Sequence, residues 1–168
     1  MNIAERLLPE FEREFTNTRK FLVLVPDDRL AWKPHEKSME MGRLAWHISG
    51  FTDRAVSVLT KTERVLSMDA LAAQRTAWMG KTREAIVANF DSQLEQARAA
   101  LAAVPDAAWE ERWQLRVGDK VMVEQSRYGA YRLVVMNHQV HHRAQLGVYL
   151  RLNDIPVPGV YGASADES

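Results

Sequence analysis

Hydrophobic residues recur at helical spacing over four long stretches, and most of these stretches end at a recognisable stop signal. We expect helices over residues 2–25, 38–58, 81–103 and 125–152. Asn2 and Glu5 can form a capping box at the start of the first helix, and Pro26 ends it because proline disfavours helical backbone in the preceding residue. The second stretch shows the three- and four-residue steps of a buried helix face at Leu44, Ile48, Phe51, Ala55 and Val58.

Two stretches between the helices carry other patterns. Residues 112–123 alternate apolar and polar side chains about a turn at Gly118-Asp119, which predicts a short β-hairpin. Residues 61–80 fit either a continuation of the second helix or a short separate helix. Val104-Pro105-Asp106 repeats Val25-Pro26-Asp27, which indicates the same helix-stop chemistry used twice or an old duplication. We expect a left-handed helix cap at Asn153 and a frayed tail over residues 163–168.

These elements predict an all-α fold, an antiparallel four-helix bundle with a short β-hairpin before the last helix. No stretch has the composition of a linker, so residues 1–168 are expected to form a single domain.

The composition narrows the chemistry. Lys plus Arg and Asp plus Glu both number 22, and this neutral balance argues against nucleic acid as the main partner. The chain has no cysteine, so a disulfide, a thiolate metal site and a catalytic cysteine are excluded. The first residues lack the form of a signal peptide, and no apolar run approaches the roughly 20 residues of a membrane span. We therefore expect a soluble cytoplasmic protein.

Three histidines stand out as candidate metal ligands. His138 and His142 lie one helical turn apart, roughly 6 Å along the axis, on a seam that also contains Val135 and Tyr149. His47 points inward from the second helix, three residues after Leu44. If these helices face each other, His47, His138 and His142 form a three-histidine site that leaves metal positions open.

Other assignments of these residues are possible. Inward histidines can instead bond to water or backbone, and His138 could chelate with His141, which we place beside the site. Asp53 could close the metal site as a fourth ligand. Gln145 could orient a metal ligand or a substrate, or make a hydrogen bond between helices.

Three further side chains near the seam have expected roles. Trp46 and Tyr149 could shape a substrate pocket. Arg143 points away from the seam and is expected in solvent.

The order and spacing of these motifs resemble the DinB/YfiT-like superfamily. The resemblance rests on His47 in the second helix, on the segment His138-Gln139-Val140-His141-His142, on the following Tyr149–Pro158 stretch and on the early Leu24–Pro34 stretch. It implies a four-helix bundle with a divalent ion on three histidines, which map onto His47, His138 and His142. Zinc, nickel, iron and manganese all occur in such proteins, and homodimers are common.

The resemblance also implies a class of reaction. Relatives include S-transferases that use bacillithiol or mycothiol and a mycothiol-dependent maleylpyruvate isomerase. We therefore expect a metal-dependent enzyme that joins a low-molecular-weight thiol to a small electrophile, as an S-transferase or an isomerase. The alternatives are a metal-dependent hydrolase, in which a bound hydroxide acts, and a non-catalytic bundle that binds a metal or a ligand.

Overall fold

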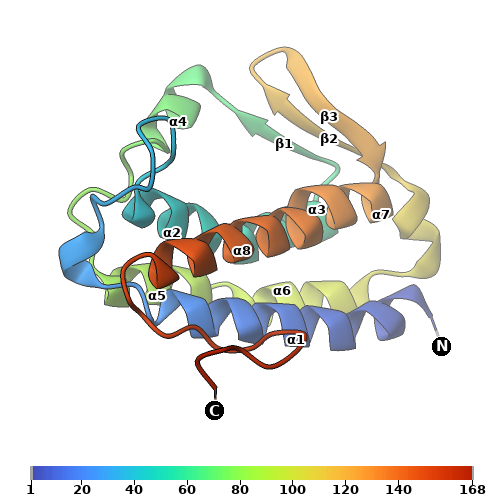
Figure 1. The fold of residues 1–168 in the computed structure, drawn as a ribbon. Coiled ribbons are helices and arrows are strands. Elements are labelled where there is room, and N and C mark those ends of the chain that lie inside the picture. Colours follow the sequence, from blue (N-terminus) through green and yellow to red (C-terminus); the bar gives the residue numbers. More distant parts are fainter. Residues whose placement is uncertain (1, 168) are drawn as a thin grey trace.

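The computed structural model describes residues 2–167 and is mostly helical, with one small sheet (Figure 1). The longer helices are α1 (Ile3–Leu22), α2 (Met41–Ser49), α3 (Phe51–Thr60), α5 (Arg83–Asp91), α6 (Leu94–Ala103) and α8 (His138–Arg151). Shorter helical pieces are η1 (Asp27–Arg29), α4 (Met68–Ala73), η2 (Asp106–Glu110), α7 (Arg127–Ala130) and a π-helical segment, η3 (Tyr131–Asn137). The strands are β1 (Glu63–Leu66), β2 (Arg112–Val117) and β3 (Lys120–Ser126).

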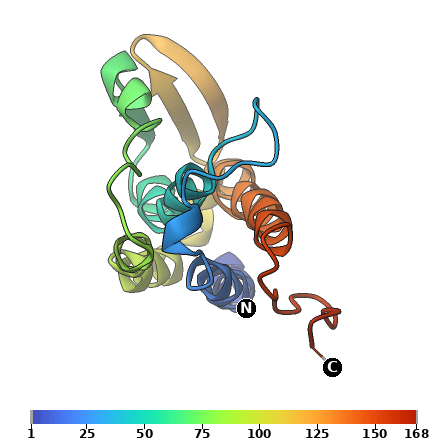
Figure 2. The same ribbon diagram turned by 60° about the vertical axis from the view of Figure 1, so that its left-hand side comes forward.

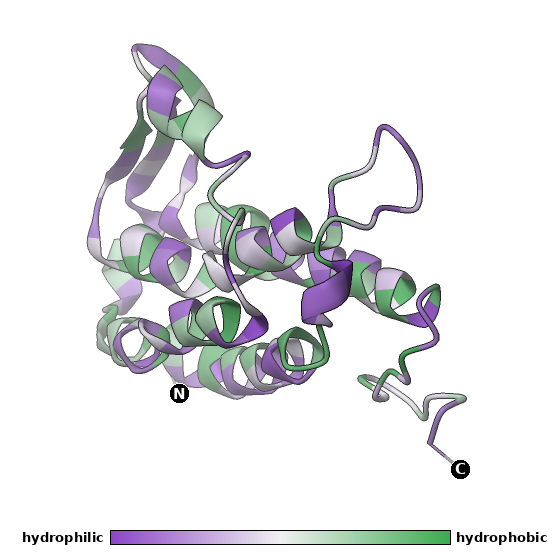
Figure 3. Ribbon diagram, turned by 90° about the vertical axis from the view of Figure 1, so that its left-hand side faces the viewer, coloured by the Kyte–Doolittle hydropathy of each residue, from purple (hydrophilic) through white to green (hydrophobic). Residues whose placement is uncertain are grey.

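The helices form two layers beneath the sheet. α1 and the α5–α6 pair lie side by side, and α2–α3 lies with the α7–η3–α8 run above them, as the nearly end-on view in Figure 2 shows. β1, β2, β3 and α4 lie on the far side of this upper layer, away from α1. Apolar residues turn toward the interior between the helices, and polar residues cover their outer sides (Figure 3).

The predicted helices exist in part, but three of them are interrupted. The stretch 38–58 is two helices that meet at Gly50, and 81–103 is two helices with a break at Ser92-Gln93. The last stretch begins at Arg127 rather than residue 125 and contains the π-helical turn. Hydrophobic spacing does not reveal such breaks because both halves of a bent helix can keep their apolar faces on one core.

The sheet is larger than the predicted hairpin. β2 and β3 pair antiparallel, but β3 continues to Ser126, and β1 adds a parallel third strand along β2. Residues 61–80 therefore supply β1 and α4, so the short separate helix exists and the continuation of the second helix, its alternative, is wrong. β1 was missed because it is four residues long and its alternate side chains are only half-buried.

Pro26-Asp27, after α1, and Pro105-Asp106, after α6, perform the same task at opposite ends of the lower helix layer. Asp27 Oδ1 accepts a hydrogen bond from the backbone N–H of Arg83, at the start of α5, at 2.6 Å. Asp106 Oδ1 accepts from the backbone N–H of Ile3, at the start of α1, at 2.9 Å. Each aspartate thus caps the start of the neighbouring helix, where unpaired N–H groups favour an anion.

The ends of the first and last helices differ partly from expectation. Asn2 and Glu5 form the predicted capping box. α1 ends at Leu22 rather than at residue 25. The left-handed residue after α8 is Asp154, with φ of 58°, and not Asn153, whose side-chain amide donates to the Tyr149 carbonyl.

The tail is folded back rather than frayed up to residue 167; Ser168 lies outside the described residues. Asp166 accepts a hydrogen bond from Arg151 at 2.6 Å, and Glu167 accepts one from the Gly159 backbone. Among the described residues, no helix is both long and apolar enough to cross a membrane.

A buried ion pair joins α1, α8 and this tail. The Arg143 guanidinium donates to Glu14 Oε2 at 2.8 Å, and both side chains are 3% exposed. Tyr161 from the tail accepts from Arg143 and donates to Glu14, both at 2.7 Å. Burial by itself would raise the pKa of Glu14, but hydrogen bonds from Tyr161, Arg143 and Arg13 outweigh burial and lower that pKa. The expectation that Arg143 lies in solvent is therefore wrong.

We expect Glu14→Gln to lower the free energy of unfolding by about 3 kcal/mol, because it leaves the Arg143 guanidinium buried without a counter-charge. Urea denaturation followed by circular dichroism measures this change. Glu12→Gln is the matched control: it removes an ion pair with Arg98 from the exposed side of the same helix and should cost less than about 1 kcal/mol. Equal losses in the two variants would contradict a structural role for the buried pair.

Candidate metal centre

The structure brings His47, His138 and His142 together, where α2 faces the start of α8. Their ligand nitrogens lie within 4.8 Å of one another. His138 Nε2 is 3.4 Å from His47 Nε2 and 2.9 Å from His142 Nε2. Three nitrogens that share a tetrahedral ion at about 2.0–2.1 Å lie about 3.3 Å apart, so a divalent ion fits this spacing with small side-chain adjustments.

A hydrogen bond on the outer nitrogen of His142 fixes how that ring points. His142 Nδ1 lies 2.7 Å from Gln145 Oε1, which can only accept, so Nδ1 carries the proton and the Nε2 lone pair faces the other histidines. For His138, the backbone of Val134, one turn earlier, opposes the fall in pKa that burial causes. Gln145 thus orients a histidine, the first of the roles expected for it.

Burial keeps the three rings neutral. It is the largest cause that lowers the pKa of His47 to about 2 and of His138 to about 4, and the nearby Arg54 guanidinium adds to both shifts. Burial also lowers the pKa of His142, although its bond to Gln145 opposes the shift. Neutral imidazole is the form that binds a metal, so the donor set is ready at neutral pH.

The other candidates near the seam are not in the ligand group. His141 is exposed, lies in the wall of the first cavity described below, and its ring contacts His142 edge-on at 4.9 Å between ring centroids. The Asp53 carboxylate pairs with Arg64 at 2.8 Å, and the group of possible metal ligands found in residues 2–167 contains histidines only. Tyr149 is buried and packs edge-on against Trp32, so the suggestion that it shapes a pocket is wrong.

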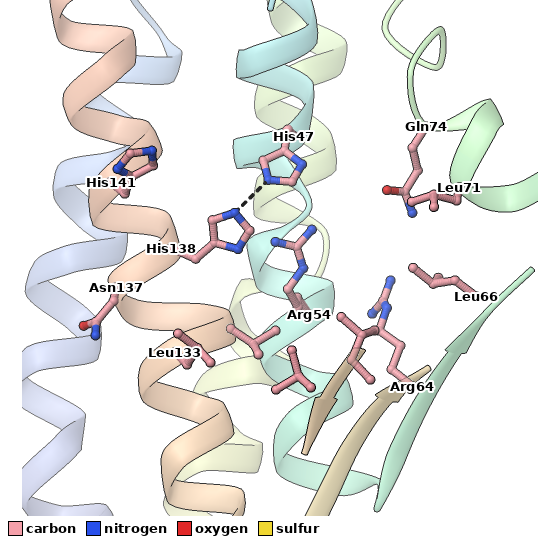
Figure 4. A pocket seen from close by; sticks show the side chains of 13 residues that line it. His47, Arg54, Arg64, Leu66, Leu71, Gln74, Leu133, Asn137, His138 and His141 are labelled. Carbon is pink, nitrogen blue, oxygen red and sulfur yellow. Dashed lines mark hydrogen bonds between the residues drawn. The ribbon is translucent and has the colours of Figure 1, made fainter. Parts of the chain in front are cut away.

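Two cavities meet at the histidine group. The first, about 580 Å³, lies between the sheet and the upper helix layer, and six of the thirteen residues that line it are aliphatic (Figure 4). The second, about 510 Å³, lies on the α2 side and is lined partly by Trp46, Arg43 and Asn89. The cavities share six residues: His47, Arg54, Arg64, Leu71, Gln74 and His138.

Arg54 is the residue at this site that the sequence analysis missed. Its guanidinium lies beside His47 and His138 in Figure 4, and its Nη1 is buried without a hydrogen-bond partner among the described residues. Burial, followed by the charge of Arg64, lowers the pKa of Arg54 to about 10, so it remains a cation at neutral pH. A signal was present in the sequence, because His47, Phe51 and Arg54 follow one helical face at steps of four and three.

Comparison with known proteins gives consistent results. The sequence profile of the DinB family matches residues 1–168. The uncharacterized protein YrdA of Bacillus subtilis is 25% identical over 163 residues, which are 97% of this chain and 90% of that protein.

Solved structures share the fold. A DinB-like protein from Bacillus subtilis, YjoA, superposes with a TM-score of 0.67 at 18% identity, over 92% of this chain and 96% of that one. A DinB-like protein from Bacillus cereus gives 0.66 at 20% identity, over 94% and 97%.

We expect the metal-free protein to lose stability as the pH falls from about 6.5 to 4.5. In the unfolded chain His47 binds a proton below its ordinary pKa of 6.5, whereas the folded protein, with a pKa of about 2, does not. The unfolded state binds more protons throughout this range, so stability falls as pH falls. His47 alone should account for about 2 kcal/mol, from about 1.4 kcal/mol per pH unit.

Urea denaturation at several pH values measures this loss. His47→Gln should make the loss smaller, and His35→Gln, in an exposed loop, should leave it unchanged. The same pH dependence in the wild type and in His47→Gln would contradict the shift that we attribute to burial.

Proposed function

The chain belongs to the DinB family, and on that premise we propose that it is a metal-dependent enzyme with a four-helix-bundle fold. In this proposal His47, His138 and His142 hold one divalent ion, which could be zinc, nickel, iron or manganese. The observation that carries it is the junction of two cavities at three converging, neutral imidazoles. Such a junction suits a reaction between two small molecules.

Three neutral nitrogen ligands leave a divalent ion with its full positive charge and with open positions. When bound, the ion supplies Lewis acidity that can hold a thiol as thiolate at neutral pH, where a free thiol of pKa about 8.5 is mostly protonated. Because the chain has no cysteine, the thiol must come from a cosubstrate. We propose thiol transfer to a small electrophile, or a thiol-dependent isomerisation.

The surrounding residues would divide the work. Gln145 holds the His142 ring so that Nε2 faces the centre, as a supporting group beside a ligand does. The second cavity, with Arg43, Asn89 and the Trp46 ring in its wall, suits the more polar of two reactants. The aliphatic wall of the first cavity suits the more apolar one and excludes water from it.

We expect the purified protein to bind about one divalent ion per chain and to lose it on His138→Ala or His142→Ala. His47→Ala should weaken binding at least about tenfold, because a site that keeps only two ligands on one helix holds the ion poorly. Elemental analysis and competition with a chelating dye measure both effects.

His141→Ala is the matched control, since it removes a neighbouring imidazole that points outside the group. A larger loss of affinity from His141→Ala than from His47→Ala would contradict the assignment of the ligands.

We expect the metal-loaded protein to join a low-molecular-weight thiol to monochlorobimane, and this turnover should disappear on chelation and in His142→Ala. His35→Ala, in an exposed loop that lines neither cavity, should retain it. Fluorescence of the bimane adduct measures the rate with each thiol.

The cobalt-loaded or nickel-loaded protein provides a separate readout, because thiol binding changes its absorption spectrum. No spectral change and no turnover with any of the common bacterial thiols would contradict thiol chemistry. Metal-dependent ester hydrolysis in the same preparation would then favour the hydrolase.

A further inference from the structure

The first cavity contains a cation that the protein itself leaves unpaired. No hydrogen bond or ion pair joins the Arg54 guanidinium to another described residue. The guanidinium packs over the Phe51 ring, whose centroid lies 4.4 Å from Cζ. Arg54 as a whole is partly buried, but its Nη1 is fully enclosed, and an enclosed N–H group without a partner is costly to keep. The position of Arg54, in the wall of both cavities and beside two of the three histidines, points to a ligand.

The acid next to Arg54 in the chain pairs with another cation. Asp53 is its neighbour in the chain, but the Asp53 carboxylate is 59% exposed and bonds to Arg64 Nη1 at 2.8 Å. The residues that line the first cavity include two arginines and no aspartate or glutamate. With Arg64 balanced by Asp53, the cavity retains one uncompensated positive charge.

Six further residues of the cavity wall are aliphatic. β1, β2 and β3 contribute Leu66, Leu115 and Val123, while α4 and the π-helical segment contribute Leu71, Leu133 and Val134. A ligand that fits must place an apolar body against this wall and an anion at Arg54. A single free guanidinium edge matches the two oxygens of a carboxylate.

We propose that the first cavity binds an apolar carboxylic acid, whose carboxylate pairs with Arg54 and whose body lies between the sheet and the π-helical segment. The inference rests on the proposed function in one respect only, namely that this acid is the electrophilic substrate of the reaction. It gives Arg54 the role of selecting and orienting the substrate beside the histidine group. The sheet and α4, which the histidines do not need, then supply most of the substrate wall.

The test uses hexanoate and hexanamide, which have nearly the same shape and differ in charge. Isothermal titration calorimetry is done on the full chain after a chelator has removed any metal and has itself been removed by buffer exchange. Neither ligand can then bind a metal ion. We expect wild-type protein to bind hexanoate at least about tenfold more tightly than hexanamide, as a charge-assisted bond in a desolvated site implies. Added salt should weaken hexanoate binding far more than hexanamide binding.

Three variants locate the charge that is responsible. Arg54→Gln should bring the ratio of the two affinities to about one, whereas Arg54→Lys should keep a preference for hexanoate. Arg98→Gln removes the same charge from the exposed α1–α6 surface and should leave the ratio unchanged. Circular dichroism confirms that each variant is folded.

Two results would overturn the proposal: equal binding of acid and amide by the wild type, or a preference for the acid that survives in Arg54→Gln. The wild-type ratio decides the matter even if a variant fails to fold. Because no metal and no thiol is present, failure here leaves the metal-binding and turnover results standing. Failure of the thiol chemistry would likewise leave the preference for the acid intact.

Discussion

The centre of the molecule is governed by the hydrogen-bonding needs of three imidazoles. His142 donates from Nδ1 to Gln145, so its Nε2 is an acceptor, and it lies 2.9 Å from His138 Nε2. Burial and the Arg54 charge lower the pKa of His138 to about 4, so this ring is neutral and has only one N–H to donate. A cation at the point where the three rings meet can accept a lone pair from each of them. The second helix then needs only to bring the His47 ring to the same point, which its inward position next to Phe51 does.

Holding the rings there requires α8 to be buried on two sides. One side carries His138, His142 and Gln145 toward α2, and the other turns Gln139 and Arg143 toward α1. Gln139 donates to Thr18 at 3.0 Å, and Arg143 bonds to Glu14, so polar contacts hold α8 against α1. Polar bonds have fixed directions, and their use here sets the rotation of α8 about its axis more strictly than aliphatic packing would. That rotation decides where the two histidines point.

This arrangement also explains how far the sequence could be read. The helical stretches and the meeting of His47, His138 and His142 followed from spacing, because a core-facing stripe repeats every three to four residues. Arg143 was assigned to solvent because the last helix was expected to have only one buried face. Its second buried face is polar, so no pattern of hydrophobic residues reveals it. β1 and the π-helical turn were missed because both are short and depend on contacts with distant segments. Arg54 was accessible in principle, seven residues after His47 on the same face, but a charged residue is normally assigned to solvent.

The charges at the junction of the two cavities limit what can bind there. The three imidazoles are neutral and the Asp53 carboxylate pairs with Arg64, but Arg54 is unpaired, and Arg43 and Arg75 also line the second cavity, whose wall has no acid besides Asp53. The protein alone therefore makes this region positive, and the proposed divalent ion would add two charges to it. Burying that much positive charge is costly unless anions arrive with the reactants. A thiolate and a carboxylate together would neutralise part of it, whereas two neutral reactants would neutralise none, so the electrostatics favour a pair of anionic ligands.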